Sequence, residues 1–182
     1  MAKRILRFSG WLAALMFVAA PPLYATVFYS KEEALKLAFP NADNVETRNF
    51  FLKPEDVQRI EGLAQSKLNS KLVTFHVGKS GDKLLGYAII DAHTVRTKPE
   101  VLLVVLNSEG QVRKVQVLAF HEPEEYLPSQ RWYQQFVGKV LTPDLQLKRE
   151  IHAVSGATLS ARAATASVRK TLALYQVLIA GK

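Results

Sequence analysis

A hydroxyl-rich stretch near the C-terminus, residues 151–163, holds the residue types best suited to chemistry in this chain. Ser155, Thr158 and Ser160 can each donate a hydrogen bond or carry a phosphoester. Gly156 lies among them and lets the backbone approach a ligand closely. An extended segment turns here into the last predicted helix, whose first turn has unpaired N–H groups and a partial positive charge. The stretch therefore predicts a phosphate-binding site, with simple helix capping as the alternative.

The segment Ser155-Gly156-Ala157-Thr158-Leu159-Ser160 resembles the flavinylation motif of the FMN-binding domain family. That family includes the exported flavin subunits of sodium-pumping NADH:quinone reductase and of the ferredoxin-linked Rnf complex. In it, a flavin transferase uses FAD to attach FMN through a phosphoester to the hydroxyl that ends an S/T-G-A-S/T-x-T/S pattern. The resemblance implies FMN as the cofactor and Ser160 as its covalent attachment point. It also implies Thr158 as a flanking motif residue, and a cradle formed by Ser155, Gly156 and Ala157.

The resemblance extends from about Leu72 to the C-terminus. Further segments occur in the family's order: Gly86-Tyr87-Ala88, Glu109-Gly110, Val115 to Phe120, Glu122-Pro123 and Phe136-Val137-Gly138-Lys139. The chain also departs from the family. A serine stands where threonine is the commoner acceptor, and His152 occupies a position where an aspartate is frequent. The usual Pro-Gly-rich loop after the glutamate is replaced by residues 122–128.

A second candidate segment, residues 121–138, carries aromatic and basic side chains. Tyr126 is expected to stack on the isoalloxazine ring, and Arg131 to stabilise the negative charge of reduced flavin near N1. Trp132 and Phe136 are four residues apart on a predicted short helix, which favours a place in the core. The acidic residues of this segment are expected to form a solvated loop: Glu122, Glu124 and Glu125.

The chain has no cysteine, which excludes disulfides, thiolate zinc sites, iron–sulfur clusters and C-x-x-C-H haem attachment. The four histidines have no H-x-x-x-H spacing, so no metal site is predicted. His76 and His93 lie on predicted strands and are expected to be partly buried packing residues. A redox function would therefore require an organic cofactor. No catalytic acid–base pair is predicted.

The N-terminal 25 residues have the pattern of a secretory signal peptide. A basic start with Lys3, Arg4 and Arg7 is followed by an apolar run and by Ala25 at a plausible cleavage point. An uncleaved membrane anchor is the alternative, although Pro21-Pro22 disfavours a straight spanning helix. Cleavage would take the net charge from +8 to +5. We therefore expect a periplasmic location, or one at the extracytoplasmic face of the inner membrane, and no nucleic-acid partner.

The remaining chain predicts a single α+β domain in which helices flank an antiparallel sheet. Residues 26–70 are expected to form an N-terminal helical extension, and residues 71–182 the FMN-binding domain. The expected helices cover 31–38, a segment from 54 that includes Leu68, 129–137 and 161–179, and the expected strands cover 45–52, 72–77, 84–95, 100–106 and 111–120.

The combined interpretation is an exported flavoprotein that carries FMN as a phosphoester and transfers electrons at the cell envelope. It is expected to be an electron-transfer subunit and not a stand-alone enzyme. The expected partners are a flavin transferase for maturation and membrane or periplasmic redox proteins. A noncovalent FMN-binding redox sensor or interaction module is the first alternative, and an exported structural protein with a capped helix is the second.

Overall fold

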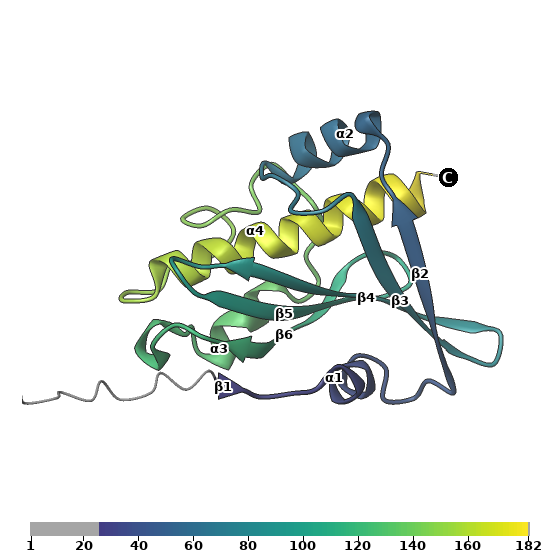
Figure 1. Ribbon diagram of the computed structural model, residues 1–182, viewed down its shortest axis with the longest axis horizontal. Helices are drawn as coiled ribbons and strands as arrows, with labels where there is room; N and C mark the ends of the chain where they lie inside the picture. Colours follow the sequence, from purple (N-terminus) through teal and green to yellow (C-terminus); the bar gives the residue numbers. More distant parts are fainter. Residues whose placement is uncertain (1–25, 182) are drawn as a thin grey trace, which may run out of the picture.

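The computed structural model describes residues 26–181 of the chain (Figure 1). The predicted signal peptide or anchor, residues 1–25, lies outside the described residues. The strands are β1 (Thr26–Val27), β2 (Asn44–Phe51), β3 (Leu72–Ser80), β4 (Lys83–Thr94), β5 (Pro99–Leu106) and β6 (Val112–Phe120). The helices are α1 (Lys31–Ala38), α2 (Pro54–Ala64), η1 (Glu124–Tyr126), α3 (Gln130–Tyr133), η2 (Gln134–Phe136), α4 (Thr158–Tyr175) and a terminal π-helix, η3 (Gln176–Ala180).

The strands form one antiparallel sheet in the order β1-β6-β5-β4-β3-β2. The predicted α+β class, with helices flanking an antiparallel sheet, is confirmed. The expected helical extension, residues 26–70, supplies both edge strands in addition to α1 and α2. Its strands are hydrogen-bonded to β6 and β3 of the following segment, residues 71–182, so the two segments share one sheet.

One face of the sheet is covered by α4, with α2 packed on α4 and α3 beside β6 (Figure 1). The buried face of α4 carries small residues, among them Ala161, Ala164 and Ala173, which allow the helix to lie close to the strands. Leu102, Val104 and Leu106 of β5 face this main core.

Arg169 joins α4 to α2 and to the loop before the motif. Its guanidinium is buried and donates hydrogen bonds to the carbonyl oxygens of Leu63, Ala64, Thr142 and Leu145, at 2.8–3.1 Å. Two of these carbonyls end α2, where helical carbonyls lack partners within the helix. Arg169 therefore fixes α2 to α4.

The opposite face of the sheet carries a smaller core under α1. Ser30 and Glu33 form the predicted capping box, with Glu33 N donating to Ser30 Oγ and Ser30 N donating to Glu33 Oε2. Ala34 and Ala38 of α1 pack in this core with Leu103 of β5. The sheet is thus held between helices on both faces.

Two predicted boundaries are wrong. The last helix begins at Thr158, three residues earlier than expected, so Thr158 and Ser160 of the motif lie within its first turn. The second helix ends at Ala64 with Gln65 in the left-handed conformation, so Leu68 lies outside it although it still packs against the main core.

Candidate functional site

In the part of the chain that the structure describes, no side chain caps the N-terminal end of α4. Gly156 has φ +81°, a conformation that favours glycine, and it turns the chain into the helix. Ala157 occupies the N-cap position and its side chain cannot accept a hydrogen bond. Ala161 N donates to Ala157 O and starts the helical ladder, which leaves the N–H groups of Thr158, Leu159 and Ser160 outside it. The predicted alternative of a simply capped helix therefore lacks its capping side chain.

The segment that leads into α4 is held by α3 and η2. Trp132 Nε1 donates a 2.7 Å hydrogen bond to His152 O, and His152 N donates a 2.8 Å hydrogen bond to Gln135 Oε1. Trp132 and Phe136 are buried in the main core, as predicted from their spacing. The exposed His152 thus contributes through its backbone, and α3 and η2 together fix the segment that leads into α4.

A cavity of about 210 Å³ lies at the N-terminal end of α4. One wall is the first turn of α4 with Gly156, and the facing walls come from the β4–β5 turn and from the segment after β6. The lining mixes apolar side chains with one cation and one carboxylate: Val95, Arg96, Glu122, Tyr126, Gly156, Ala157, Thr158, Leu159 and Ser160.

Most of the predicted site residues meet at this cavity. Gly156, Ala157, Thr158 and Ser160 line it together with Tyr126, which comes from the separate segment after β6. Ser155 is exposed and lies just outside the lining.

The structure does not bring Arg131 to the cavity. Arg131 is exposed on α3, and the cation that lines the cavity is Arg96 of the β4–β5 turn. The guanidinium of Arg96 makes no ion pair with another residue of the range 26–181. Arg96 is therefore available to bind a negative ligand, which is the role that was expected of Arg131.

The two hydroxyls of the motif that lie on α4 differ in exposure and in hydrogen bonding. Ser160 is 1% exposed, and its Oγ atom is buried without a hydrogen-bond partner within residues 26–181. Thr158 is exposed at the start of the helix, and its Oγ1 donates a 3.3 Å hydrogen bond to Val154 O. The Ser160 hydroxyl is thus unpaired but enclosed, whereas the Thr158 hydroxyl is accessible but already has a partner.

Glu122 is partly exposed, and its carboxylate is held by hydrogen bonds from the β4–β5 turn. Its Oε1 atom accepts hydrogen bonds from backbone N–H groups of the β4–β5 turn. The N–H groups of Thr97 and Lys98 contribute most to holding the pKa of Glu122 below its usual value. Glu122 is thus an ordered part of the cavity wall.

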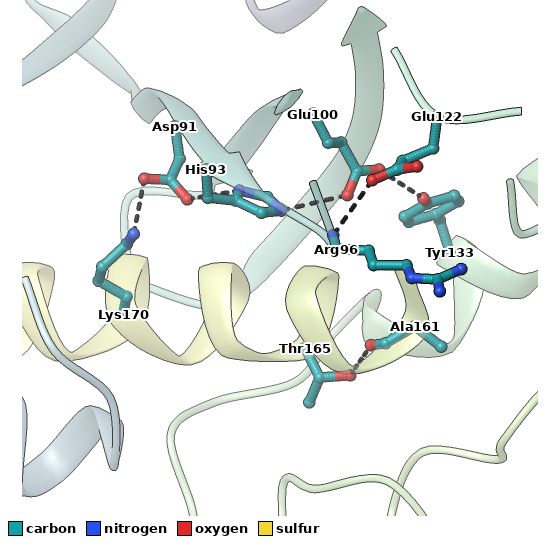
Figure 2. A network of polar contacts seen from close by, with 9 residues as sticks. All are labelled: Asp91, His93, Arg96, Glu100, Glu122, Tyr133, Ala161, Thr165 and Lys170. Carbon is teal, nitrogen blue, oxygen red and sulfur yellow. Dashed lines mark hydrogen bonds and ion pairs between the residues drawn. The ribbon is translucent and has the colours of Figure 1, made fainter. Parts of the chain in front are cut away.

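A chain of buried and partly buried polar side chains lies between the sheet and α4, close to the cavity (Figure 2). Lys170 Nζ lies 2.7 Å from Asp91 Oδ1, and His93 bridges Asp91 Oδ2 and Glu100 Oε2 at 3.1 Å each. Tyr133 Oη donates to Glu100 Oε1 at 3.1 Å. Glu100 and Tyr133 are completely or almost completely buried.

His93 is therefore an ionic residue and not the expected packing residue. Burial by itself lowers the pKa of His93, but the hydrogen bonds with Asp91 and Glu100 outweigh it and raise the pKa to about 9. Burial opposes the charged form of Asp91 as well, but His93 and Lys170 bring its pKa well below the usual range. Burial is the main cause that raises the pKa of Tyr133. His93 is thus protonated at neutral pH, and both of its ring N–H groups donate.

Within residues 26–181, no cluster of three or more histidine, aspartate or glutamate side chains is arranged to hold a metal ion. In the same range, no helix has the length and hydrophobicity needed to cross a membrane.

Residues 97–173 match the profile of the FMN-binding domain family. The matched range includes Glu122, Tyr126 and the cavity-lining turn of α4, whereas Val95 and Arg96 directly precede it. The match confirms the resemblance that was predicted from the motif.

The chain is also similar to one component of a known redox complex. It is 23% identical over 178 residues to a subunit of the Na(+)-translocating ferredoxin:NAD(+) oxidoreductase complex of Acetobacterium woodii. The alignment covers 92% of this chain and 84% of that relative. Together, the two matches support FMN as the cofactor of this chain.

The residues at the cavity fit the chemistry of FMN. The uncapped first turn of α4 offers N–H donors to a phosphate, and the orphaned Ser160 Oγ adds a buried hydroxyl beside them. Tyr126 and Val95 provide apolar surface for a ring, and Arg96 provides a positive charge. A flavin bound here would supply the redox chemistry, and the protein would orient it and set its electrostatic surroundings.

Proposed function

We propose that this chain is an FMN-carrying electron-transfer protein of the cell envelope, with the flavin at the cavity beside the N-terminal end of α4. The single observation that carries the proposal is that the motif residues from Gly156 to Ser160 line one cavity together with Tyr126 and Arg96, which come from separate segments. The chain's similarity to a subunit of a ferredoxin:NAD(+) oxidoreductase complex supports membrane redox proteins as its partners. The basic and apolar pattern of residues 1–25 supports export.

The size of the cavity favours covalent attachment over noncovalent binding. Its volume is about 210 Å³, below the roughly 300–1,000 Å³ typical of sites that enclose most of a small-molecule ligand. A partly enclosed flavin would make fewer contacts and would be retained better by a covalent bond. The noncovalent sensor or interaction module is therefore the less favoured candidate.

We propose Ser160 as the acceptor, because its hydroxyl has no hydrogen-bond partner among the described residues and the residue lines the cavity. A buried hydroxyl without a partner is costly, and a phosphoester at this position removes that cost. The burial of Ser160 implies that the first turn of α4 opens when a transferase acts on it. Thr158, exposed on the same turn, is the competing acceptor.

The attachment step is a transfer of the FMN half of FAD. A flavin transferase would bring FAD to the hydroxyl of Ser160. The Ser160 oxygen then forms a bond to the phosphorus of the FMN half, the bond from that phosphorus to AMP breaks, and AMP leaves. The hydroxyl proton passes to a base of the transferase. The chain thereby gains the mass of one FMN less one water.

Co-expression with a periplasmic flavin transferase tests the proposal. The full-length protein is denatured and measured by in-gel flavin fluorescence and by intact mass. We expect the label in the wild type, in Ser160→Thr and in Thr158→Ala, and its loss in Ser160→Ala. Ser108→Ala is the matched control and should keep the label, because Ser108 is an exposed hydroxyl outside the motif that does not line the cavity.

Each other result identifies a different error. A label that survives Ser160→Ala and disappears in Thr158→Ala would move the acceptor to the exposed hydroxyl. Flavin that is released from the wild type on denaturation would favour the noncovalent module. A colourless protein without a gain in mass, in the presence of an active transferase, would refute the proposed function.

A further inference from the structure

The carboxylate of Glu122 is bound by three consecutive backbone N–H groups. Its Oε1 atom accepts from Thr97 N and Lys98 N, each at 2.8 Å, and from Arg96 N at 3.3 Å. The hydroxyl of Thr97 adds a fourth contact at 3.4 Å. Successive N–H groups that converge on one point form an anion-binding nest. In this protein, the anion is supplied by the chain itself.

The nest lies at the β4–β5 turn, and Glu122 reaches it from the segment after β6. Val95 N donates to Lys98 O and closes the turn. His121 N donates to Pro99 O and forms a second link between the two segments. Hydrogen bonds to a charged acceptor are stronger than those to a neutral one, so Glu122 holds the turn more firmly than a neutral side chain would.

The turn held by Glu122 carries two residues of the proposed flavin cavity. Val95 and Arg96 line the cavity opposite the first turn of α4. In Figure 2, the Arg96 side chain runs from the turn toward the end of α4 that carries Ala161, while its backbone nitrogen points to Glu122. The backbone N–H of Arg96 thus belongs to the nest, and its side chain lines the cavity.

We propose that Glu122 is a positioning residue for FMN and that it acts through the β4–β5 turn, by holding Val95 and Arg96 against the flavin. This inference rests on the proposed function. Glu122 keeps the cavity wall at a fixed place relative to α4, and it keeps the positive charge of Arg96 beside the ring. The residue acts through its neighbours and takes no part in electron transfer itself.

Two substitutions and one control test this role. Glu122→Ala removes the acceptor, and Glu122→Gln keeps an oxygen but removes the charge. Glu125→Gln is the matched control, because Glu125 is an exposed carboxylate of the same segment that does not line the cavity. Far-UV circular dichroism verifies that each variant folds. If Glu122→Ala does not fold, the comparison of Glu122→Gln with the wild type tests the role.

Two measurements are made on each variant. In the flavin-free protein, amide exchange by NMR follows the N–H groups of Thr97 and Lys98, which we expect to exchange about tenfold faster in Glu122→Ala. In the FMN-loaded protein, visible circular dichroism of the flavin reports how firmly the ring is oriented. We expect that signal to lose most of its amplitude in Glu122→Ala, to lose less in Glu122→Gln, and to stay unchanged in Glu125→Gln.

The outcomes separate this inference from the proposed function. Faster amide exchange with an unchanged flavin signal would show that Glu122 only braces the turn, and it would overturn the inference. Unchanged amide exchange of Thr97 and Lys98 in Glu122→Ala would also overturn the inference, because it would show that Glu122 does not hold the β4–β5 turn. A wild-type protein that takes up no flavin would refute the proposed function and this inference with it, and the amide exchange would still show whether Glu122 holds the turn.

Discussion

Substitution of His93 by glutamine should remove a large, pH-dependent part of the stability of the fold. The pKa of His93 is raised to about 9 in the folded protein, from an ordinary value of 6.5. The folded state therefore holds this proton more tightly than the unfolded state. The resulting stabilisation is complete below pH 6.5, and it is lost as the pH rises through 9. Each pH unit between the two values is worth about 1.4 kcal/mol, so the total is about 3 kcal/mol.

Burial supports the use of this magnitude. The His93 side chain is 10% exposed, and its partners Asp91 and Glu100 are 12% and 0% exposed, so water screens these contacts little. We expect the free energy of unfolding of the wild type to fall by about 3 kcal/mol between about pH 6.5 and about pH 9.5. In His93→Gln it should change much less over the same range, because glutamine does not titrate.

Urea denaturation of the flavin-free protein at a series of pH values measures the difference, with tryptophan fluorescence as the signal. The relevant quantity is wild type minus variant, because other groups that titrate in this range cancel in it. His152→Gln is the control, since His152 is exposed and its contacts are made by its backbone. Parallel curves for the wild type and His93→Gln would refute the reasoning.

Two further substitutions follow from the contacts described above. Arg169→Ala should lower the free energy of unfolding by about 3 kcal/mol, because four buried carbonyl contacts are lost. Arg169→Lys should recover little of this loss. A loss below about 1 kcal/mol for Arg169→Ala in urea denaturation would contradict the prediction. Gly156→Ala should cost about 1–2 kcal/mol through its backbone conformation alone, since its added Cβ would meet no atom within 4 Å. Gly81→Ala has the same open surroundings and also a positive φ, so it should cost a similar amount in urea denaturation without reducing flavin attachment.

The fold was predictable from the sequence where a local pattern determines an element. Ser30 and Glu33 are three residues apart and form the capping box that the sequence indicates. The start of α4 was missed because Ala157 at its N-cap position gives no capping signal in the sequence. The role of residues 26–70 in the sheet was missed because it depends on pairing between distant strands, such as Thr26 with Phe120.

The site was predictable to the extent that one segment carries it. The motif from Gly156 to Ser160 lies at the cavity, but the difference in burial between Thr158 and Ser160 depends on where the helix begins. Arg96 was missed because it lies far along the chain from the motif and in an ordinary turn.

The buried ionic chain was only partly visible in the sequence. Asp91 and His93 are two residues apart on a strand and so share one face, which was a usable signal. Their partner Lys170 gave none, because it belongs to a helix that the sequence does not connect to β4.

The order of the strands limits how this flavin module can be exchanged between proteins. The range that matches the family contains only β5 and β6, while β4, β3 and both edge strands lie before it. A chimera that grafts residues 97–173 alone would leave α4 with two strands to pack on and would separate Arg96 from the cavity. Transplantation therefore has to include residues 26–96. The segment that must be moved to transfer the flavin site is longer than the range 97–173 that matches the family.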